Sequence, residues 1–425
     1  MVTNPLMASE IDALTETAPP EPGAFLRRFA RPTAHGNYIP ELDGLRFVSI
    51  ALVLVFHIGV VIGLDRGWYT AVPPFGGARA LRAPDGFFAT IVDRGSVGVL
   101  VFFTISGFVL AMPFIQRRIR ADRGDDLGHY YLRRLLRIEP PYIVAMVLAF
   151  LVAHAIAGRP SLASLVASLG YVHQPLFADS SPANASAWSL EVEVQWYLVV
   201  PLLALILLPG SRRRRWLTIG LLFAVASLYQ IEVGNGSVRS FTFLLSWLPF
   251  FLVGWLLADI TLTGRPPDPR NAYRWDLLSL VGWPVLLLTV GSWASERLLT
   301  PWLIMALCAA AMRGRRTRRL LRTPALVAIG TMCYSIYLLH YPTFLLIRRL
   351  IGPAPNAPFS VQFLFWLFLV VPATLSAAAI FFLVVERPCM DPRWASKIKA
   401  KARSIVPGLP ASDYEREQVP EKRVP

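Results

Sequence analysis

The chain has 425 residues, of which 55% are hydrophobic and 16% are charged. Soluble domains carry about 25% charged residues, so this shortage of charge excludes a single soluble domain and a disordered chain. Nearly uncharged segments such as 361–386 are long enough to cross a bilayer. They predict an all-α fold, a polytopic integral membrane helical bundle. An outer-membrane barrel is excluded because its strands alternate polar and apolar residues over about ten positions.

The formal net charge is +15, from 42 basic and 27 acidic residues. In a soluble protein this excess would indicate nucleic-acid binding. Here the arginines form short clusters between apolar runs, which is typical of cytoplasmic loops, and no nucleic-acid motif accompanies them. We therefore expect the lipid bilayer as a partner and no nucleic acid. Three widely separated cysteines predict neither a disulfide framework nor a metal site.

The apolar runs predict about ten transmembrane helices. The loops on one side of this arrangement hold twenty arginines and those on the other side hold seven. The positive-inside rule then places both termini in the cytoplasm of a multi-pass protein of the cell membrane. We expect a polar N-terminal tail at 1–36, a membrane domain at 37–390 and a basic C-terminal tail at 391–425. The expected spans are 45–64, 95–115, 141–157, 190–208, 216–232, 240–260, 276–293, 298–312, 324–349 and 361–386.

Two ionisable residues fall in the first expected span. Arg46 is near its cytoplasmic start, and His57 follows eleven residues later, which places both on one face of a helix about 16 Å apart along the axis. Asp43, one turn before Arg46, can pair with it. An ordinary explanation remains open for each: a neutral histidine bonded within the bundle, and an arginine that extends to the interface.

The fourth expected span carries a carboxylate at Glu193. Ser189, Glu193 and Tyr197 recur every fourth residue and share one stripe of the helix. Trp188 is explained by an interfacial position, whereas a carboxylate in an apolar helix is costly and indicates a function.

Two further spans contribute cavity candidates. In the ninth, Tyr337 and His340 are one turn apart, just before Pro342. An aromatic belt at the outer interface and the lining of a cavity explain them equally well. In the second, Ser106 precedes Gly107, a pair that favours close helix packing or a bend over a functional hydroxyl.

Arg134 and Arg137 lie in the expected loop before the third span. Most loop arginines only determine orientation, but this pair, three residues apart, can also form a fork for phosphate groups. At the other end of the chain, Glu386 closes the last span, where we expect it to pair with a loop arginine.

Taken in order, these segments resemble the acyltransferase-3 family of integral membrane O-acyltransferases over about 37–390. The motifs are Leu42-Asp43-Gly44-Leu45-Arg46 with His57, Phe102-Phe103-x-x-Ser106-Gly107-Phe108, Arg134-x-x-Arg137-Ile138-x-Pro140, Trp188-Ser189-Leu190-x-x-Glu193, Tyr337-Leu338-x-His340-x-Pro342, and Glu386-x-Pro388.

The resemblance implies transfer of an acyl group, commonly acetyl, from acyl-coenzyme A to a hydroxyl of a carbohydrate or other cell-envelope acceptor. It implies Arg46 and His57 as the essential pair, and Arg134 and Arg137 as donor-binding residues. No tightly bound cofactor is expected, since acyl-coenzyme A is the donor substrate.

This chemistry agrees with the residues themselves. Acyl transfer to an alcohol needs a base, and a neutral histidine serves near pH 7. We expect His57 to be that base, Glu193 or another polar group of the bundle to orient it, and Arg134, Arg137 and Arg46 to hold the coenzyme. The main alternative is a proton-coupled transporter or flippase, in which His57, Glu193 and His340 relay protons. A structural scaffold would not need Arg46 and His57 on one face.

Overall fold

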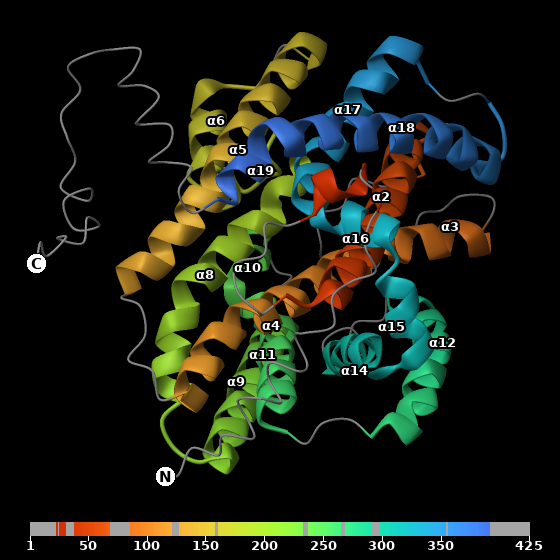
Figure 1. Ribbon diagram of the computed structural model, residues 1–425. Helices are drawn as coiled ribbons and strands as arrows, with labels where there is room; N and C mark the ends of the chain where they lie inside the picture. The colour runs from red at the N-terminus through yellow and green to blue at the C-terminus, as the bar shows by residue number, and fades with distance from the viewer. Residues whose placement is uncertain are drawn as a thin grey trace, which may run out of the picture.

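The computed structural model describes residues 23, 25–30, 38–68, 86–120, 127–157, 160–232, 237–264, 268–290, 298–353 and 356–391. Every regular element within these ranges is helical (Figure 1), as the apolar runs predicted. Nearly all of the two expected tails, 1–36 and 391–425, lies outside them.

The helices follow one another along the chain with short connections. They are α2 (Pro40–Asp65), α3 (Gly86–Asp93), α4 (Val97–Arg120), α5 (Leu127–Ala157), α6 (Leu162–Leu169), α7 (His173–Phe177), α8 (Trp188–Leu207), α9 (Arg212–Glu232), α10 (Val238–Phe241), α11 (Leu248–Thr263), α12 (Ala272–Thr289), α14 (Thr300–Arg313), α15 (Arg315–Leu321), α16 (Pro324–Thr331), α17 (Cys333–Ile351), α18 (Phe359–Phe381) and α19 (Arg387–Cys389). A π-helical turn, Phe382–Glu386, joins α18 to α19.

The number of spans is smaller than predicted. Each of the ten expected spans contains a helix, but only five helical stretches of the described residues are long and apolar enough to cross a membrane. Helices α11 and α14 are apolar but too short. A sixth span results if α16 and α17 count as one, and these are bent by 68° where they meet. Apolar windows in the sequence do not show where a helix breaks, so about ten spans is not confirmed.

The bend between α16 and α17 brings α16 against the start of α2. A Cβ added at Gly330 would lie within 1.7 Å of the carbonyl oxygen of Asp43, so only glycine permits this approach. The contact fixes the first motif of the chain, and Arg46 with it, beside the N-terminal end of α17.

Helices α4 and α11 approach each other as closely. A Cβ on Gly107 would meet the carbonyl oxygen of Phe251 at 2.2 Å, and one on Gly254 would meet that of Thr104 at 2.1 Å. Small residues allow such contacts between membrane helices. Gly107 thus has the packing role predicted for the Ser-Gly pair, and its neighbour Ser106 points elsewhere.

The third expected span begins earlier than predicted. Helix α5 runs unbroken from Leu127 through Pro140 and Pro141, so Arg134 and Arg137 lie on a helix and not in a loop. A residue before proline is biased away from helical geometry, which is why a boundary was expected here. Because the helix continues, the two arginines lie on neighbouring positions of one face.

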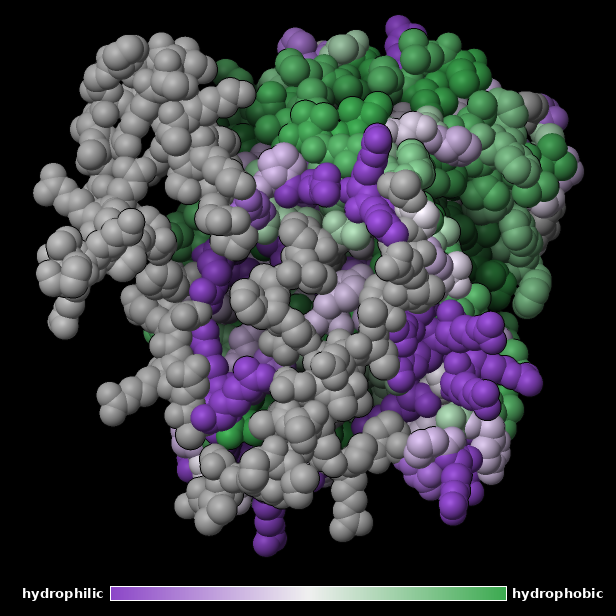
Figure 2. Space-filling model, viewed as in Figure 1, coloured by the Kyte–Doolittle hydropathy of each residue, from purple (hydrophilic) through white to green (hydrophobic). Residues whose placement is uncertain are grey.

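The outer surface is suited to lipid. Large apolar side chains such as Leu205, Leu280 and Phe368 are exposed on α8, α12 and α18. Figure 2 shows hydrophobic residues over α17 and α18 and hydrophilic residues lower on the same face, around α15. A band of exposed apolar side chains is expected where helices contact acyl chains and no water.

Candidate functional site

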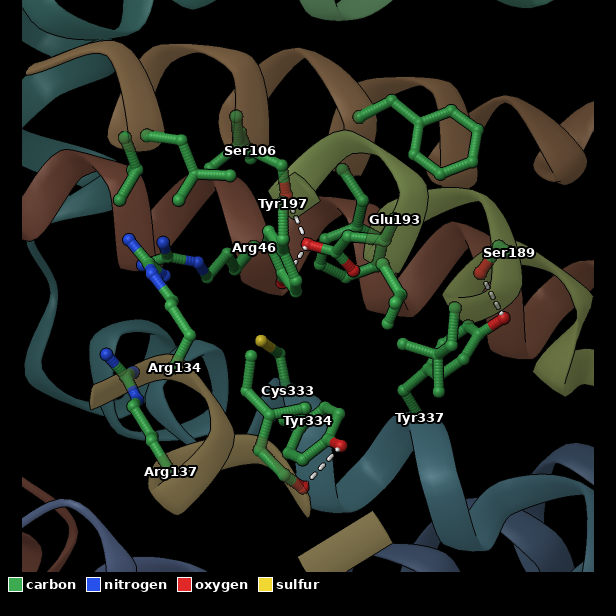
Figure 3. Close-up of a pocket in the computed structure, with 18 of the residues that line it drawn as sticks. Arg46, Ser106, Arg134, Arg137, Ser189, Glu193, Tyr197, Cys333, Tyr334 and Tyr337 are labelled. Carbon is green, nitrogen blue, oxygen red and sulfur yellow. Dashed lines mark hydrogen bonds between the residues drawn. The ribbon is translucent and has the colours of Figure 1, made fainter. Parts of the chain in front are cut away.

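A cavity lies inside the bundle between α2, α4, α5, α8 and α17. Figure 3 shows its polar side chains in two groups, with Arg46, Arg134 and Arg137 at one end and Ser189 with Tyr337 at the other. Seven of the residues that the sequence suggested as catalytic, donor-binding or cavity residues line it: Arg46, Ser106, Arg134, Arg137, Ser189, Glu193 and Tyr337.

Arg46 is held in place by Asp43. Its Nη1 donates to Oδ1 of the carboxylate at 2.5 Å, which confirms the pair predicted one turn apart. Asp43 is fully buried, and its other oxygen accepts from the hydroxyl of Tyr38 at 3.0 Å. Asp43 itself does not line the cavity. It balances the charge of Arg46 and orients the guanidinium toward the cavity.

The arginines of α5 meet aromatic rings. The guanidinium carbon of Arg134 lies 5.6 Å from the ring centroid of Tyr197 and 5.9 Å from that of Tyr130. Contact with two ring faces stabilises a cation that has left bulk water. Arg137 follows three residues later at the same end of the cavity (Figure 3). Three arginines from two helices thus lie together at this end of the cavity.

Glu193 lines the cavity wall, and one of its carboxylate oxygens accepts hydrogen bonds from two hydroxyl groups. Its Oε1 accepts from Ser106 at 2.6 Å and from Tyr197 at 2.6 Å. A membrane carboxylate needs such donors to remain in place. Within the described residues, Glu193 therefore bonds two hydroxyls, and its expected partner, His57, has other contacts.

Tyr337 closes the far end. Its hydroxyl is 2.6 Å from that of Ser189 and also donates to the backbone carbonyl of Ser186. The ring centroid lies 5.6 Å from that of His340, which places Tyr337 between the cavity and the histidine.

His57 and His340 lie next to each other, outside the set of residues that line the cavity. Their ring centroids are 4.7 Å apart, with the planes at 71°. Proline in α17 helps to place His340. Pro342 has no N–H for the carbonyl of Leu338, and the side chain of Asn184 donates to that oxygen at 3.0 Å instead. The carbonyl of Leu338 therefore keeps a hydrogen-bond donor, although Pro342 interrupts the helix next to the candidate residue His340.

Trp188 and Glu386 have contacts that the sequence did not suggest. Trp188 packs against Phe241 and Trp247, with centroids 4.9 and 5.5 Å away, and does not line the cavity. Glu386 accepts from the backbone N–H of Ser335 at 3.1 Å and from its hydroxyl, at the start of α17. It lines the cavity, a role that its place at the end of a span did not suggest.

Two further tyrosines line the cavity: Tyr197, which the sequence placed on one stripe with other candidates, and Tyr334, which the sequence alone did not select. Tyr197 belongs to the stripe with Ser189 and Glu193, and this spacing was sufficient to find it. Tyr334 lines the cavity and donates to the carbonyl of Ile138 at 3.1 Å. That contact joins α17 to α5, and no spacing along the chain reveals it.

The arrangement combines an anion-binding end with a deeper group of bases and hydroxyls. Arginines bind phosphates by charge-assisted hydrogen bonds. A pair of histidines in a partly dry environment can accept a proton from an alcohol. These are the two parts that transfer from a phosphate-bearing donor requires.

Comparison with known proteins agrees with a site for acyl transfer. Residues 39–383 match the family model described as an acyltransferase domain. The chain is 27% identical over 386 residues to the acyltransferase MdmB of Streptomyces mycarofaciens, an alignment covering 83% of this chain and 92% of that protein. It is 24% identical over 349 residues to the O-acetyltransferase OatA of Staphylococcus aureus, covering 73% of this chain and 51% of that protein. No solved structure matches.

The match extends over most of the membrane bundle and includes all the cavity-lining helices named above. Neither relative is named a transporter, so that alternative gains no support. The chain is an acyltransferase and belongs to the acyltransferase-3 family.

Proposed function

We propose that this protein transfers an acyl group, acetyl by family resemblance, from acyl-coenzyme A to a hydroxyl of a carbohydrate of the cell envelope. The observation that carries the proposal is the cavity whose positive end contains Arg46, Arg134 and Arg137 and whose far end meets His340 and His57 through Tyr337. The name of OatA, an O-acetyltransferase, supports acetyl as the group transferred.

The donor would enter at the arginine end. Its phosphates would bind Arg134 and Arg137, and its extended arm would follow the cavity past Glu193 toward Tyr337. The helical spacing of Arg46 and His57, about 16 Å along the axis, sets the length that this arm has to cover. By the positive-inside rule we expect this end at the cytoplasmic surface, where coenzyme A is found.

His57 would act as the general base. It takes the proton of the acceptor hydroxyl as the oxygen attacks the thioester carbon, and the coenzyme A thiolate leaves and is protonated in turn. Because Tyr337 separates the cavity from the histidines in this structure, its side chain has to turn aside when the thioester arrives. That movement breaks its bonds to Ser189 and Ser186.

The test is acyl transfer by purified protein in lipid vesicles, with radiolabelled acetyl-coenzyme A and a pool of envelope glycans. We expect His57→Ala to lower transfer by at least about 100-fold, the lower range for loss of a general base. His154→Ala is the control, since His154 is exposed on α5. Full transfer by His57→Ala, or none by the unaltered protein with several acyl donors, would overturn the proposal.

A further inference from the structure

A groove lies between α12, α15 and α2, apart from the cavity described above. Helices α12 and α15 are in contact at one side of the bundle (Figure 1). Val48 of α2 lines the groove, whereas Arg46 lines the cavity. Two residues along a helix turn by about 200°, so the groove and the cavity lie on opposite faces of α2. The groove has a volume of about 1090 Å³, which is large enough for a bound organic molecule.

Three arginines line this groove. Arg270 precedes α12, Arg315 and Arg316 begin α15, and all three are exposed. In the part of the chain that the structure describes, none of these guanidinium groups has an ion-pair or hydrogen-bond partner. Asp276, the acidic residue of the lining, accepts from the backbone N–H groups of Arg316 and Thr317 at 3.0 and 2.9 Å. The three arginines therefore exceed the acidic charge of the groove and suit an anion.

Most of the remaining lining is apolar. Leu277, Leu280 and Leu320 have 57%, 74% and 62% of their surface exposed, and Trp283 lies in the same groove. Apolar side chains this exposed on a membrane protein are expected to contact acyl chains. A soluble anion such as inorganic phosphate would use the arginines and leave these side chains without a partner. An anionic phospholipid would use both parts.

One polar group of the lining supports a ligand with further oxygens. Ser279 is 7% exposed, and its hydroxyl has no hydrogen-bond partner among the described residues. Buried polar groups without a partner are few in native proteins, and each needs an explanation. In a phospholipid, ester and glycerol oxygens lie between the phosphate and the acyl chains, where such a hydroxyl can donate to them.

We infer that this groove binds an anionic phospholipid of the cytoplasmic leaflet, with its phosphate on Arg270, Arg315 and Arg316 and its acyl chains along α12. Both arginine segments belong to the clusters that we expect on the cytoplasmic side, and that leaflet carries the anionic lipids. Basic pockets between membrane helices on this side bind such headgroups. The inference does not rest on the proposed function.

The bound lipid would stabilise the start of α2. Nε of Arg318 on α15 donates to Oε1 of Glu41 on α2 at 2.5 Å, so α15 is already joined to that helix. A ligand that binds the folded protein and not the unfolded chain raises the melting temperature. Lipid between α12 and α15 therefore holds in place the helix that bears Arg46.

The test measures the melting temperature of the purified protein in neutral detergent. We expect it to rise with added phosphatidylglycerol and to change little with phosphatidylcholine or inorganic phosphate. The dependence on lipid concentration gives an apparent Kd. An equal rise with phosphatidylcholine would show that charge is not recognised, and an equal rise with inorganic phosphate would show that the acyl chains are not. Either result, or no rise with phosphatidylglycerol, would overturn the inference.

Combined replacement of Arg270, Arg315 and Arg316 by glutamine should raise the apparent Kd for phosphatidylglycerol at least about tenfold, since each arginine near an anionic headgroup adds to binding. The melting temperature without lipid shows whether this variant is folded. If it is not, Arg270→Gln alone takes its place, because Arg270 is exposed on a short turn before α12. An unchanged Kd in the folded variant would contradict the site.

The matched control is a cluster of equal charge without a groove. Arg212, Arg213 and Arg214 are exposed at the start of α9 and do not line the groove. Their combined replacement by glutamine should leave the apparent Kd within about twofold. An equal loss of affinity in both triple variants would show general attraction to basic surface and would overturn the inference.

Discussion

Each arginine of the cavity has a different electrostatic setting. Arg46 is paired with a buried carboxylate, so much of its charge is already balanced. Arg134 meets only aromatic faces among the contacts described above, and these do not neutralise it. A phosphate at this end would thus gain more from Arg134 than from Arg46, and Arg46 would serve to orient the donor.

Replacement of Arg134 or Arg137 by glutamine should therefore weaken donor binding more than turnover. A charge-assisted hydrogen bond is worth about 1.5–3 kcal/mol, so we expect KM for acetyl-coenzyme A to rise about 10- to 100-fold in each variant. Arg133→Gln removes the same charge from an exposed neighbour outside the cavity and should change KM by less than about twofold. Steady-state kinetics in vesicles measures both, and an equal rise in all three variants would contradict the assignment.

For single residues, the sequence indicated candidate site residues but few of the side chains that they contact. Helical spacing placed Ser189, Glu193 and Tyr197 on one stripe, and the structure confirms that all three line the cavity. Ser106, which bonds Glu193, is 87 residues away in the chain. The packing of the whole bundle determines which helices lie side by side. The periodicity within one helix does not predict these neighbours.

Helix contacts depend on a few positions where no side chain fits. Along α4 and α11, the backbones approach so closely that Gly107 and Gly254 have no room for a Cβ. This contact holds the helix that bears Ser106 at the depth where its hydroxyl reaches Glu193. The packing of α11 thus determines part of the cavity wall without contributing to it.

Gly254→Val should destabilise the bundle by at least about 1–3 kcal/mol, because an overpacked contact between two backbones cannot relax by a rotamer change. Gly220→Val on α9 is the matched control, since a Cβ there meets nothing within 4 Å. Thermal unfolding of the purified proteins in detergent measures the difference. Equal melting temperatures for the two variants would show that α4 and α11 can separate at little cost.

The element boundaries show what local sequence rules missed. Two prolines predicted a helix start near 141, but α5 runs through them, since tertiary contacts such as that from Tyr334 support the chain there. The opposite occurred at 324–349, where one apolar run proved to be two helices bent by 68°. Hydropathy indicates which residues avoid water, but it does not predict where the backbone of a helix bends or breaks.

We expect the orientation of the whole molecule in the membrane to follow from its charges. Arginine clusters mark the side that we expect to face the cytoplasm, and the cavity opens toward three arginines of its own. If the donor binds as proposed, donor binding and orientation depend on the same asymmetry of charge. An inverted protein would present the proposed phosphate-binding end to a compartment without coenzyme A.

Single cysteines test this orientation. Arg213→Cys lies in the basic segment at the start of α9, and Ala163→Cys is exposed on α6. In intact cells, we expect a membrane-impermeant thiol reagent to label Ala163→Cys only, with Arg213→Cys labelled after lysis. The native Cys308, Cys333 and Cys389 are all buried, so the unaltered protein gives the background. Labelling of Arg213→Cys in intact cells would reverse the assigned orientation.

The hydrogen bonds of Tyr337 also bear on the membrane potential of the cell. A continuous water-filled passage from the arginines to the outer surface would let protons and other ions leak and dissipate the membrane potential. Tyr337, which bonds Ser189 and Ser186, is the lining residue that lies between the cavity and His340. In the proposed mechanism, Tyr337 leaves this position only when the acyl donor fills the cavity, so transfer would proceed without an open path for ions.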